Sequence, residues 1–160
     1  MTASLIAAHA SPDQPGATLH ALDAALAETP GHVLFTILLH HPETQDSVRC
    51  YSNHPAEYPV GGRKQLTDSA WMRRVVQHGE PWIGHDAHAI RGAFYDHATV
   101  LALGCESVLN MPVRWRGETV GTLNLLHRAG HYTDAHIPHV ALLAHLALPA
   151  LLAFTPDRLV

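Results

Sequence analysis

Histidine is unusually frequent in this chain, with 15 copies among 160 residues. Imidazole binds metal ions and exchanges protons near neutral pH, so these side chains are the first candidates for chemistry. One segment combines His85, Asp86 and His88, and an acid–histidine pair follows at 96–97. Such groups ligate zinc or iron when a third and a fourth ligand converge on them. The histidines are scattered along the whole chain, which is also typical of compositional drift, and both interpretations stay open.

The two cysteines, Cys50 and Cys105, are the candidate nucleophiles. They are too few for a secreted disulfide scaffold and indicate a reducing, cytoplasmic compartment. A redox pair would require Cα atoms within about 4.4–6.8 Å of each other, whereas a free cysteine is usually a small buried hydrophobic residue. Cys105 follows Gly104 at the entrance to a predicted strand, so it is the stronger candidate for a reactive thiol.

Two asparagines are predicted to lie side by side on a β-hairpin formed by residues 107–114 and 118–127. Side chains alternate along a strand, and a three-residue turn at 115–117 places Asn110 opposite Asn124 with the leucines on the other face. A two-residue turn would separate the two asparagines. A buried, unpaired amide costs about 1–3 kcal/mol, so the pair must bond either loop backbone or a ligand.

Apolar periodicity and turn residues predict the elements that hold these side chains. Leu19, Leu22 and Leu26 recur at helical spacing and predict a helix over 17–28, which Pro30 and Gly31 end. The apolar run 33–39 predicts a central buried strand. The other expected elements are a strand at 47–52, a loop at 53–64, a helix at 68–78, an edge strand at 82–84, short helical pieces over 85–104 and a helix at 134–154.

This order predicts an α+β fold with an antiparallel sheet of five or six strands. One domain at 17–154 is expected, after a flexible lead-in at 1–16 and before a tail at 155–160. Ten Lys and Arg residues against 14 Asp and Glu residues argue against sequence-independent nucleic-acid binding. The N-terminus lacks the basic and apolar regions of a signal peptide.

The segment 135–154 contains no Asp, Glu, Lys or Arg and is long enough to cross a membrane. It includes three histidines and two prolines, so we expect a helix buried against a partner helix and no membrane anchor. If the apolar helices at 17–28 and 134–154 pack side by side, they leave excess apolar surface that a second copy would cover. The sequence therefore predicts a homodimer.

The order of elements and several local motifs resemble those of a GAF domain, a small sensory module related to PAS. The strongest match is 107–126, with an apolar strand, Pro-Val, a short turn with glycine, then Val-Gly and a second apolar strand. Residues 79–83 resemble the passage from helix to edge strand, and 132–134 resemble the cap of the last helix. The resemblance covers 17–154 and implies terminal helices on one face of the sheet. A ligand site is implied on the other face, beneath a cover at 53–66 and 84–104.

The resemblance implies a sensory or regulatory domain that binds an unidentified small molecule. We expect it to act through the dimer of its terminal helices, and either a separate signalling protein receives the signal or no such partner exists. The Asn-Lys-Phe-Asp-Glu signature of members that bind cyclic nucleotides is absent, no cysteine matches the bilin site, and no cofactor is identified. The segment 59–62 resembles a loop of the free methionine-(R)-sulfoxide reductases, although their flanking cysteines are missing. A reductase that uses Cys105 is one alternative, and a metal sensor that uses His85, Asp86 and His88 is another.

The residues expected to form the ligand site are aromatic or polar, as ligand walls usually are. For Trp71, packing in the core is the alternative role. Arg63 and Lys64 either attract an anion or are simply solvated. The expected site residues are Tyr51, Trp71, Trp82, Phe94, Tyr95, Cys105, Asn110 and Asn124.

Overall fold

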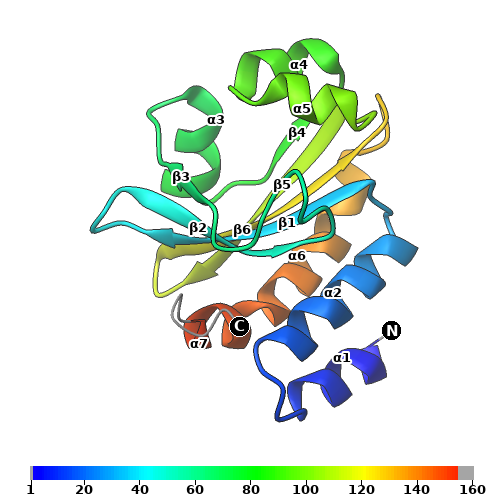
Figure 1. The fold of residues 1–160 in the computed structure, drawn as a ribbon, viewed down its shortest axis with the longest axis vertical. Coiled ribbons are helices and arrows are strands. Elements are labelled where there is room, and N and C mark those ends of the chain that lie inside the picture. Colours follow the sequence, from blue (N-terminus) through cyan, green and yellow to red (C-terminus); the bar gives the residue numbers. More distant parts are fainter. Residues whose placement is uncertain (1, 155–160) are drawn as a thin grey trace.

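The computed structural model describes residues 2–154, which fold around a six-stranded antiparallel sheet with the strand order β3-β2-β1-β6-β5-β4 (Figure 1). The α+β class and the upper estimate of the strand number are confirmed. The expected tail at 155–160 lies outside the described residues. The strands are β1 (Leu34–His41), β2 (Asp46–Ser52), β3 (Arg63–Gln65), β4 (Trp82–Gly84), β5 (Ser107–Trp115) and β6 (Glu118–His127).

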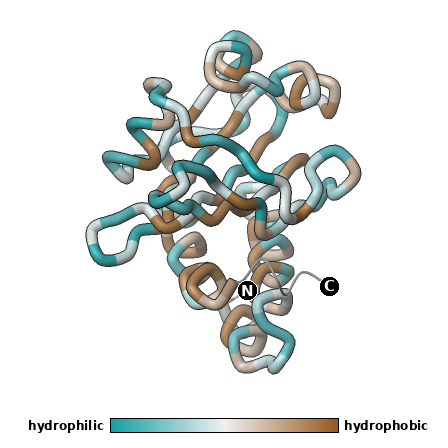
Figure 2. The backbone as a smooth tube through the Cα atoms, turned by 60° about the vertical axis from the view of Figure 1, so that its left-hand side comes forward, coloured by the Kyte–Doolittle hydropathy of each residue, from teal (hydrophilic) through white to brown (hydrophobic). Residues whose placement is uncertain are grey.

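One face of the sheet is covered by α2 (Gly16–Glu28), α6 (Ile137–Leu146) and α7 (Leu148–Ala153), and α1 (Thr2–His9) packs against α2 in the same helical layer (Figure 1). The predicted stripe of Leu19, Leu22 and Leu26 is buried, and α2 contacts both α6 and α7, so the expected side-by-side packing of the terminal helices is confirmed. Figure 2 shows hydrophobic stretches in the sheet and in this helical layer. The prediction of a flexible lead-in is wrong for α1, because Leu5 is buried in the same core.

The last helical segment is divided into three pieces, a 3-10 turn η2 (Asp134–His136), α6 and α7. The break falls just before Pro149, which has no N–H to continue an α-helical hydrogen-bond ladder. By length and composition alone, Asp134–Ala153 resembles a membrane span, a test that core helices of water-soluble proteins also pass. Its inner face packs against the sheet through Val140, Ala144 and Leu151.

The opposite face of the sheet is covered by short helices and by the segment 53–62. The side chains of Ser69 and Asp86 accept hydrogen bonds from backbone N–H groups and begin α3 and α4. The expected loop at 53–64 ends earlier than predicted, because β3 begins at Arg63 and adds the sixth strand. The helical elements of this cover are α3 (Ala70–Met72), a π-helical turn η1 (Arg73–Gln77), α4 (Ala87–Ala93) and α5 (His97–Ala102).

The β5–β6 hairpin has the predicted side-chain register but a different turn. Asn110 is paired with Asn124, as expected. The turn has only two residues, Arg116 and Gly117, with φ of 53° and 84°, as in a type I′ turn. A bulge between Val113 and Arg114 in the register leaves one extra residue on β6 and shifts the pairing by one. The expectation of a three-residue turn is therefore wrong. With the shorter turn, it is the bulge that places Asn110 and Asn124 on the same face of the hairpin.

Candidate ligand pocket

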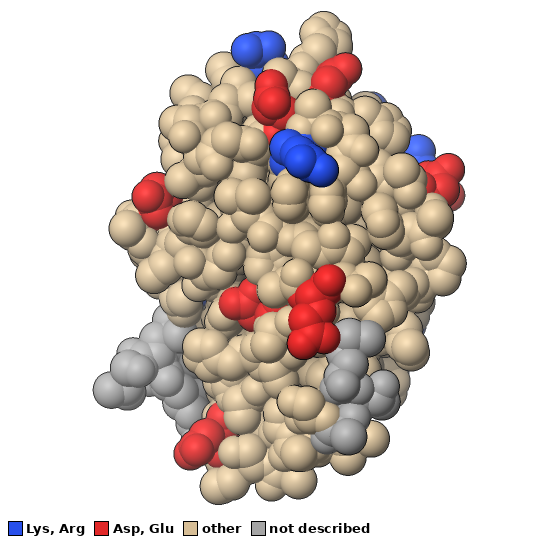
Figure 3. Space-filling view, turned by 90° about the vertical axis from the view of Figure 1, so that its right-hand side faces the viewer, with Lys and Arg blue, Asp and Glu red and all other residues tan. Residues whose placement is uncertain are grey.

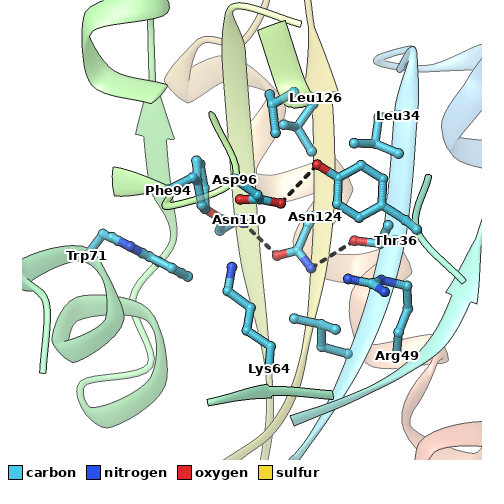
Figure 4. Close-up of a pocket in the computed structure, with 13 residues that line it drawn as sticks. Leu34, Thr36, Arg49, Lys64, Trp71, Phe94, Asp96, Asn110, Asn124 and Leu126 are labelled. Atoms are coloured by element: carbon cyan, nitrogen blue, oxygen red, sulfur yellow. Dashed lines mark hydrogen bonds between the residues drawn. The ribbon is translucent and has the colours of Figure 1, made fainter. Parts of the chain in front are cut away.

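A pocket of about 50 Å³ lies between the sheet and its cover (Figure 4). It is at the place that the sequence resemblance implied. Strands β1, β5 and β6 form its floor, while β2, β3 and the cover supply its walls. The lining residues are Leu34, Thr36, Leu38, Arg49, Tyr58, Lys64, Trp71, Phe94, Asp96, Val100, Asn110, Asn124 and Leu126.

The floor of the pocket is a chain of polar side chains on three adjacent strands. Asn110 Nδ2 donates a hydrogen bond to Asn124 Oδ1 at 2.6 Å, and Asn124 Nδ2 donates to Thr36 Oγ1 at 3.3 Å. The asparagines thus bond each other instead of loop backbone. Asn110 Oδ1 is buried and has no hydrogen-bond partner among the described residues, which leaves one acceptor for another molecule.

Lys64 enters the pocket from β3 with its ammonium group surrounded by aromatic rings. Its Nζ lies 5.1 Å, 5.4 Å and 5.5 Å from the ring centroids of Phe94, Trp71 and Tyr95. Cation–π attraction favours the charged amine in this position. Burial lowers the pKa of Lys64, the Asp96 carboxylate opposes this shift, and the Arg49 charge adds to it. Within residues 2–154 the amine makes no direct hydrogen bond or ion pair.

Arg49 is the second cation of the pocket. Its guanidinium lies 5.0 Å from the ring centroid of Tyr58 and donates a hydrogen bond to the Pro59 carbonyl at 3.0 Å. Burial lowers the pKa of Arg49, and Tyr58 and Asp96 partly offset that effect. Its Nε is buried without a hydrogen-bond partner in the described part of the chain, so one donor is unsatisfied.

Asp96 is the one carboxylate in the pocket lining. Its Oδ2 accepts a hydrogen bond from the Tyr58 hydroxyl at 2.9 Å, and burial together with this carboxylate raises the pKa of Tyr58. Its Oδ1 is buried and unpartnered among the described side chains. In Figure 4 the Lys64 ammonium points toward Asp96 and Asn124, but no ion pair joins it to the carboxylate.

The unsatisfied hydrogen-bonding groups are concentrated in this pocket. Five buried side-chain atoms of the described residues lack a hydrogen-bond partner, and those of Arg49, Asp96 and Asn110 belong to its lining. Since buried polar groups in proteins are almost always paired, this concentration indicates a site for a polar ligand or ordered water. Two cations and one carboxylate favour a ligand that carries a negative group.

The structure brings four of the predicted site residues together at the pocket, namely Trp71, Phe94, Asn110 and Asn124. Trp71 also donates a hydrogen bond from Nε1 to the Ala93 carbonyl at 2.7 Å, so it has a structural role besides forming the wall. Trp82 packs against the rings of Trp71 and Phe94 but does not line the pocket. Tyr95 is 78% exposed and contributes only to the surroundings of Lys64.

Tyr51 was expected at the same cavity and lies on the opposite face of the sheet. A β-bulge at Cys50 causes this, because Thr36 to Leu38 of β1 pair with Ser52, Tyr51 and then Arg49. Without the bulge, Arg49 and Tyr51 would share a face. Instead Tyr51 joins the helix-side core, where its hydroxyl donates a hydrogen bond to Asp23 at 2.5 Å.

Four polar lining residues, Thr36, Arg49, Tyr58 and Asp96, were not among the predicted site residues. Tyr58 and Asp96 do fall within the predicted cover segments, which was the available signal for them. Arg63 and Lys64 were considered as adjacent residues that could attract an anion, and only Lys64 lines the pocket. Arg63 forms an ion pair with Asp46 instead.

The cysteine and metal alternatives gain no support from the geometry. Cys105 is fully buried outside the pocket lining, and burial raises its pKa to about 11. Cys50 belongs to the core on the other face of the sheet, so the two thiols lie in separate clusters. In residues 2–154 no three His, Cys, Asp or Glu side chains are grouped to hold a metal ion, and Asp86 serves as a helix cap.

A six-stranded antiparallel sheet with a helical layer on one face and a small pocket beneath a cover on the other is a GAF-like α+β fold. The chain belongs to the GAF domain family, whose model matches residues 14–151. No protein of curated function matches the chain.

Solved structures with the same fold share little sequence with this chain. The GAF domains of phosphoenolpyruvate-protein phosphotransferases from Acinetobacter and Coxiella burnetii are 16% and 18% identical to it. They superpose with TM-scores of 0.74 and 0.73, over 94% and 92% of this chain and 89% and 88% of theirs. The type II free methionine-R-sulfoxide reductase from Thermoplasma acidophilum is 15% identical, with a TM-score of 0.64 over 85% of this chain and 90% of its own. At these identities the likeness shows the fold alone.

Proposed function

We propose that this protein is a sensory or regulatory domain that binds a small carboxylate in the pocket between sheet and cover. The observation that carries the proposal is the concentration of unsatisfied groups there. Arg49 Nε is a buried free donor, and Asn110 Oδ1 and Asp96 Oδ1 are buried free acceptors. The Lys64 amine lines the same pocket and offers a further charged donor. A carboxylate would satisfy the donors, while a hydroxyl or another donor on the same molecule would satisfy an acceptor.

The volume of the pocket limits the size of the ligand. A space of about 50 Å³ holds only a few water molecules or an organic molecule with a handful of heavy atoms. A nucleotide or a tetrapyrrole would require the cover to move away from the sheet. A ligand that contacts both the sheet and the cover would increase the population of the closed state of the cover. We propose that this change in population is the signal.

Binding is expected to depend on the two pocket cations and not on the neighbouring surface cation. Purified protein is titrated calorimetrically with formate, acetate, glycolate and pyruvate, and at least one of them is expected to bind. Lys64→Met and Arg49→Met are each expected to weaken that binding by about tenfold or more, because each removes a charged donor.

Arg63→Met is the matched control, since Arg63 is next to Lys64 on β3 but pairs with Asp46 outside the pocket. It is expected to leave the affinity unchanged. No binding of any of the four carboxylates, or equal affinity in all three variants, would contradict the proposed function.

We also propose that two copies associate through the helical layer, and that a separate signalling protein reads the dimer. Ile6, Leu142 and Leu152, on α1, α6 and α7, are 65%, 65% and 55% exposed. All three lie in the same helical layer, and an exposed apolar patch on such a layer is typical of an interface. The cytoplasmic location stays a prediction from the small number of cysteines. On the face of the described chain in Figure 3, Lys and Arg do not gather into a basic patch, and the absence of nucleic-acid binding stays a prediction.

The dimer is expected to dissociate in Leu142→Glu, because the charge would be buried at the interface. Sedimentation equilibrium should then give the mass of one chain for this variant and of two chains for the unmodified protein. Val60→Glu replaces an exposed apolar side chain on the cover and should leave the dimer intact. The same mass for Leu142→Glu and the unmodified protein would rule out this interface.

A further inference from the structure

Lys64 is the single lysine of the chain, and its amine lies inside the pocket. Lysines usually lie at the surface, where water or a carboxylate holds the ammonium group. Here three aromatic rings surround Nζ, and within the described residues no carboxylate forms an ion pair with it. The amine can therefore react without first breaking an ion pair with a described residue.

We propose that Lys64 captures a small 2-oxo acid as an imine, with the carboxylate held by Arg49 and the carbonyl carbon joined to Nζ. This inference rests on the proposed function, because it uses the same carboxylate recognition. The neutral amine adds to the carbonyl carbon and forms a C–N bond. The resulting carbinolamine loses water, which leaves a C=N bond to Nζ. No oxidant or reductant is consumed.

The surroundings of Nζ suit each stage of this reaction. Burial lowers the pKa of Lys64 and so raises the fraction of neutral, nucleophilic amine. The product iminium is a cation, and the rings of Trp71 and Phe94 stabilise a cation at this position. Asp96 faces the amine with an unpartnered Oδ1, which can accept the proton released on addition and return it to the departing water.

The rest of the pocket selects among carbonyl compounds. Arg49 Nε is the free donor for the acid group, which an aldehyde without a carboxylate cannot use. With a volume of about 50 Å³ the pocket admits glyoxylate or pyruvate and excludes long 2-oxo acids unless the cover opens. The inferred ligand class is thus a 2-oxo acid of two or three carbons.

The experiment traps the imine in the intact chain. Protein is incubated at pH 7 with glyoxylate or pyruvate, reduced with borohydride, and mapped by peptide mass spectrometry. One adduct on Lys64 is expected, at a rate above that of an ordinary lysine, with the N-terminal amine as the internal reference. An ordinary lysine would label more than about a hundredfold more slowly than that amine, because its pKa lies well above that of an α-amino group.

Variants separate capture from simple binding. Arg49→Met is expected to slow trapping of glyoxylate about tenfold more than it slows trapping of acetaldehyde, because only glyoxylate has a carboxylate to lose its partner, whereas Arg63→Met changes neither rate. Lys64→Arg should show label only at the N-terminus. Pyruvate and lactate share a carboxylate but differ in the carbonyl. If calorimetry shows that both bind and no Lys64 adduct forms, capture is refuted and the proposed function stands. If neither binds, and an adduct forms without dependence on Arg49, carboxylate recognition is refuted.

Discussion

Gly121→Ala is expected to lower the free energy of unfolding by about 3 kcal/mol, the upper range for overpacking a well-packed core. Gly121 lies in the middle of β6, paired with Leu39 on one side and Val113 on the other. A Cβ at this position would be 2.5 Å from the Leu38 carbonyl oxygen and 2.9 Å from Leu151 Cδ1. The leucine could turn away, but the carbonyl belongs to the backbone of the neighbouring strand, so the sheet itself would have to shift.

Chemical denaturation of both proteins measures this loss, and Gly92→Ala is the matched control. A Cβ at Gly92, on α4, would meet no atom within 4 Å, so the same substitution should be neutral or stabilise by up to about 1 kcal/mol. In a background with Leu151→Ala the Gly121 substitution should remain costly, since the Leu38 carbonyl is unchanged. A loss at Gly121 no larger than at Gly92 would show that the sheet adapts at little cost.

Acidification from pH 6.5 to pH 4 is expected to remove about 3 kcal/mol of stability through His40 alone. This side chain is buried, and burial, with smaller effects of His41 and Lys64, lowers its pKa from 6.5 to about 4. Its Nδ1 lies 2.8 Å from Ser47 Oγ, and Nε2 has no partner among the described residues. Between these two pH values the unfolded chain binds a proton that the folded chain does not. Stability is therefore complete above pH 6.5 and falls as the pH drops toward 4.

Urea unfolding at a series of pH values tests this expectation. Asp23 and Asp46 also have lowered pKa values, so their contribution to the free energy of unfolding falls in acid as well. The contribution of His40 is therefore measured as the difference between a His40 variant and the unmodified protein. His40→Gln should have a much smaller loss between pH 6.5 and pH 4. His88→Gln, at an exposed position on α4, should retain the full loss. Equal pH profiles for His40→Gln and the unmodified protein would show that another group causes the acid sensitivity.

Most of the fold could be predicted because its elements carry strong local signals. The run 33–39 is apolar on both faces, as a central strand must be, and β1 is paired with a strand on each side. Helix α2 has a regular leucine stripe and ends where Pro30 and Gly31 were expected to end it. Helix α1 was missed because the segment is short and rich in alanine, and among its residues 4–9 only Leu5 is buried, which gives no periodicity to detect.

Only part of the pocket could be predicted, since its residues meet through irregularities that have no simple sequence pattern. Asn110 and Asn124 were placed correctly because alternation along a long hairpin is a strong constraint. Tyr51 was misplaced by one bulged residue in β2. Arg63 and Lys64 are consecutive on a strand of three residues, too short for alternation to indicate which side chain faces inward.

The residues that line the pocket come from five strands and from the cover. This distribution explains why composition alone did not reveal that the pocket contains charged side chains. Arg49, Lys64 and Asp96 come from β2, β3 and the segment before α5, and each is separated from the next by a turn or a loop. Their convergence is a property of the strand order and not of any local motif. The overall net charge of −4 likewise conceals a cavity in which cations outnumber carboxylates.

The bulge on β6 makes length changes in the β5–β6 hairpin interdependent. Val120 is the residue that the bulge leaves unpaired, and the two-residue turn is compatible with the asparagine pair only because of it. A lineage that inserted one residue at Arg116–Gly117 would reverse the inward and outward faces of one strand, unless it also deleted the residue at 120. Paired insertions and deletions, about four residues apart, are thus the route by which this hairpin can drift without exchanging its ligand-facing amides for leucines.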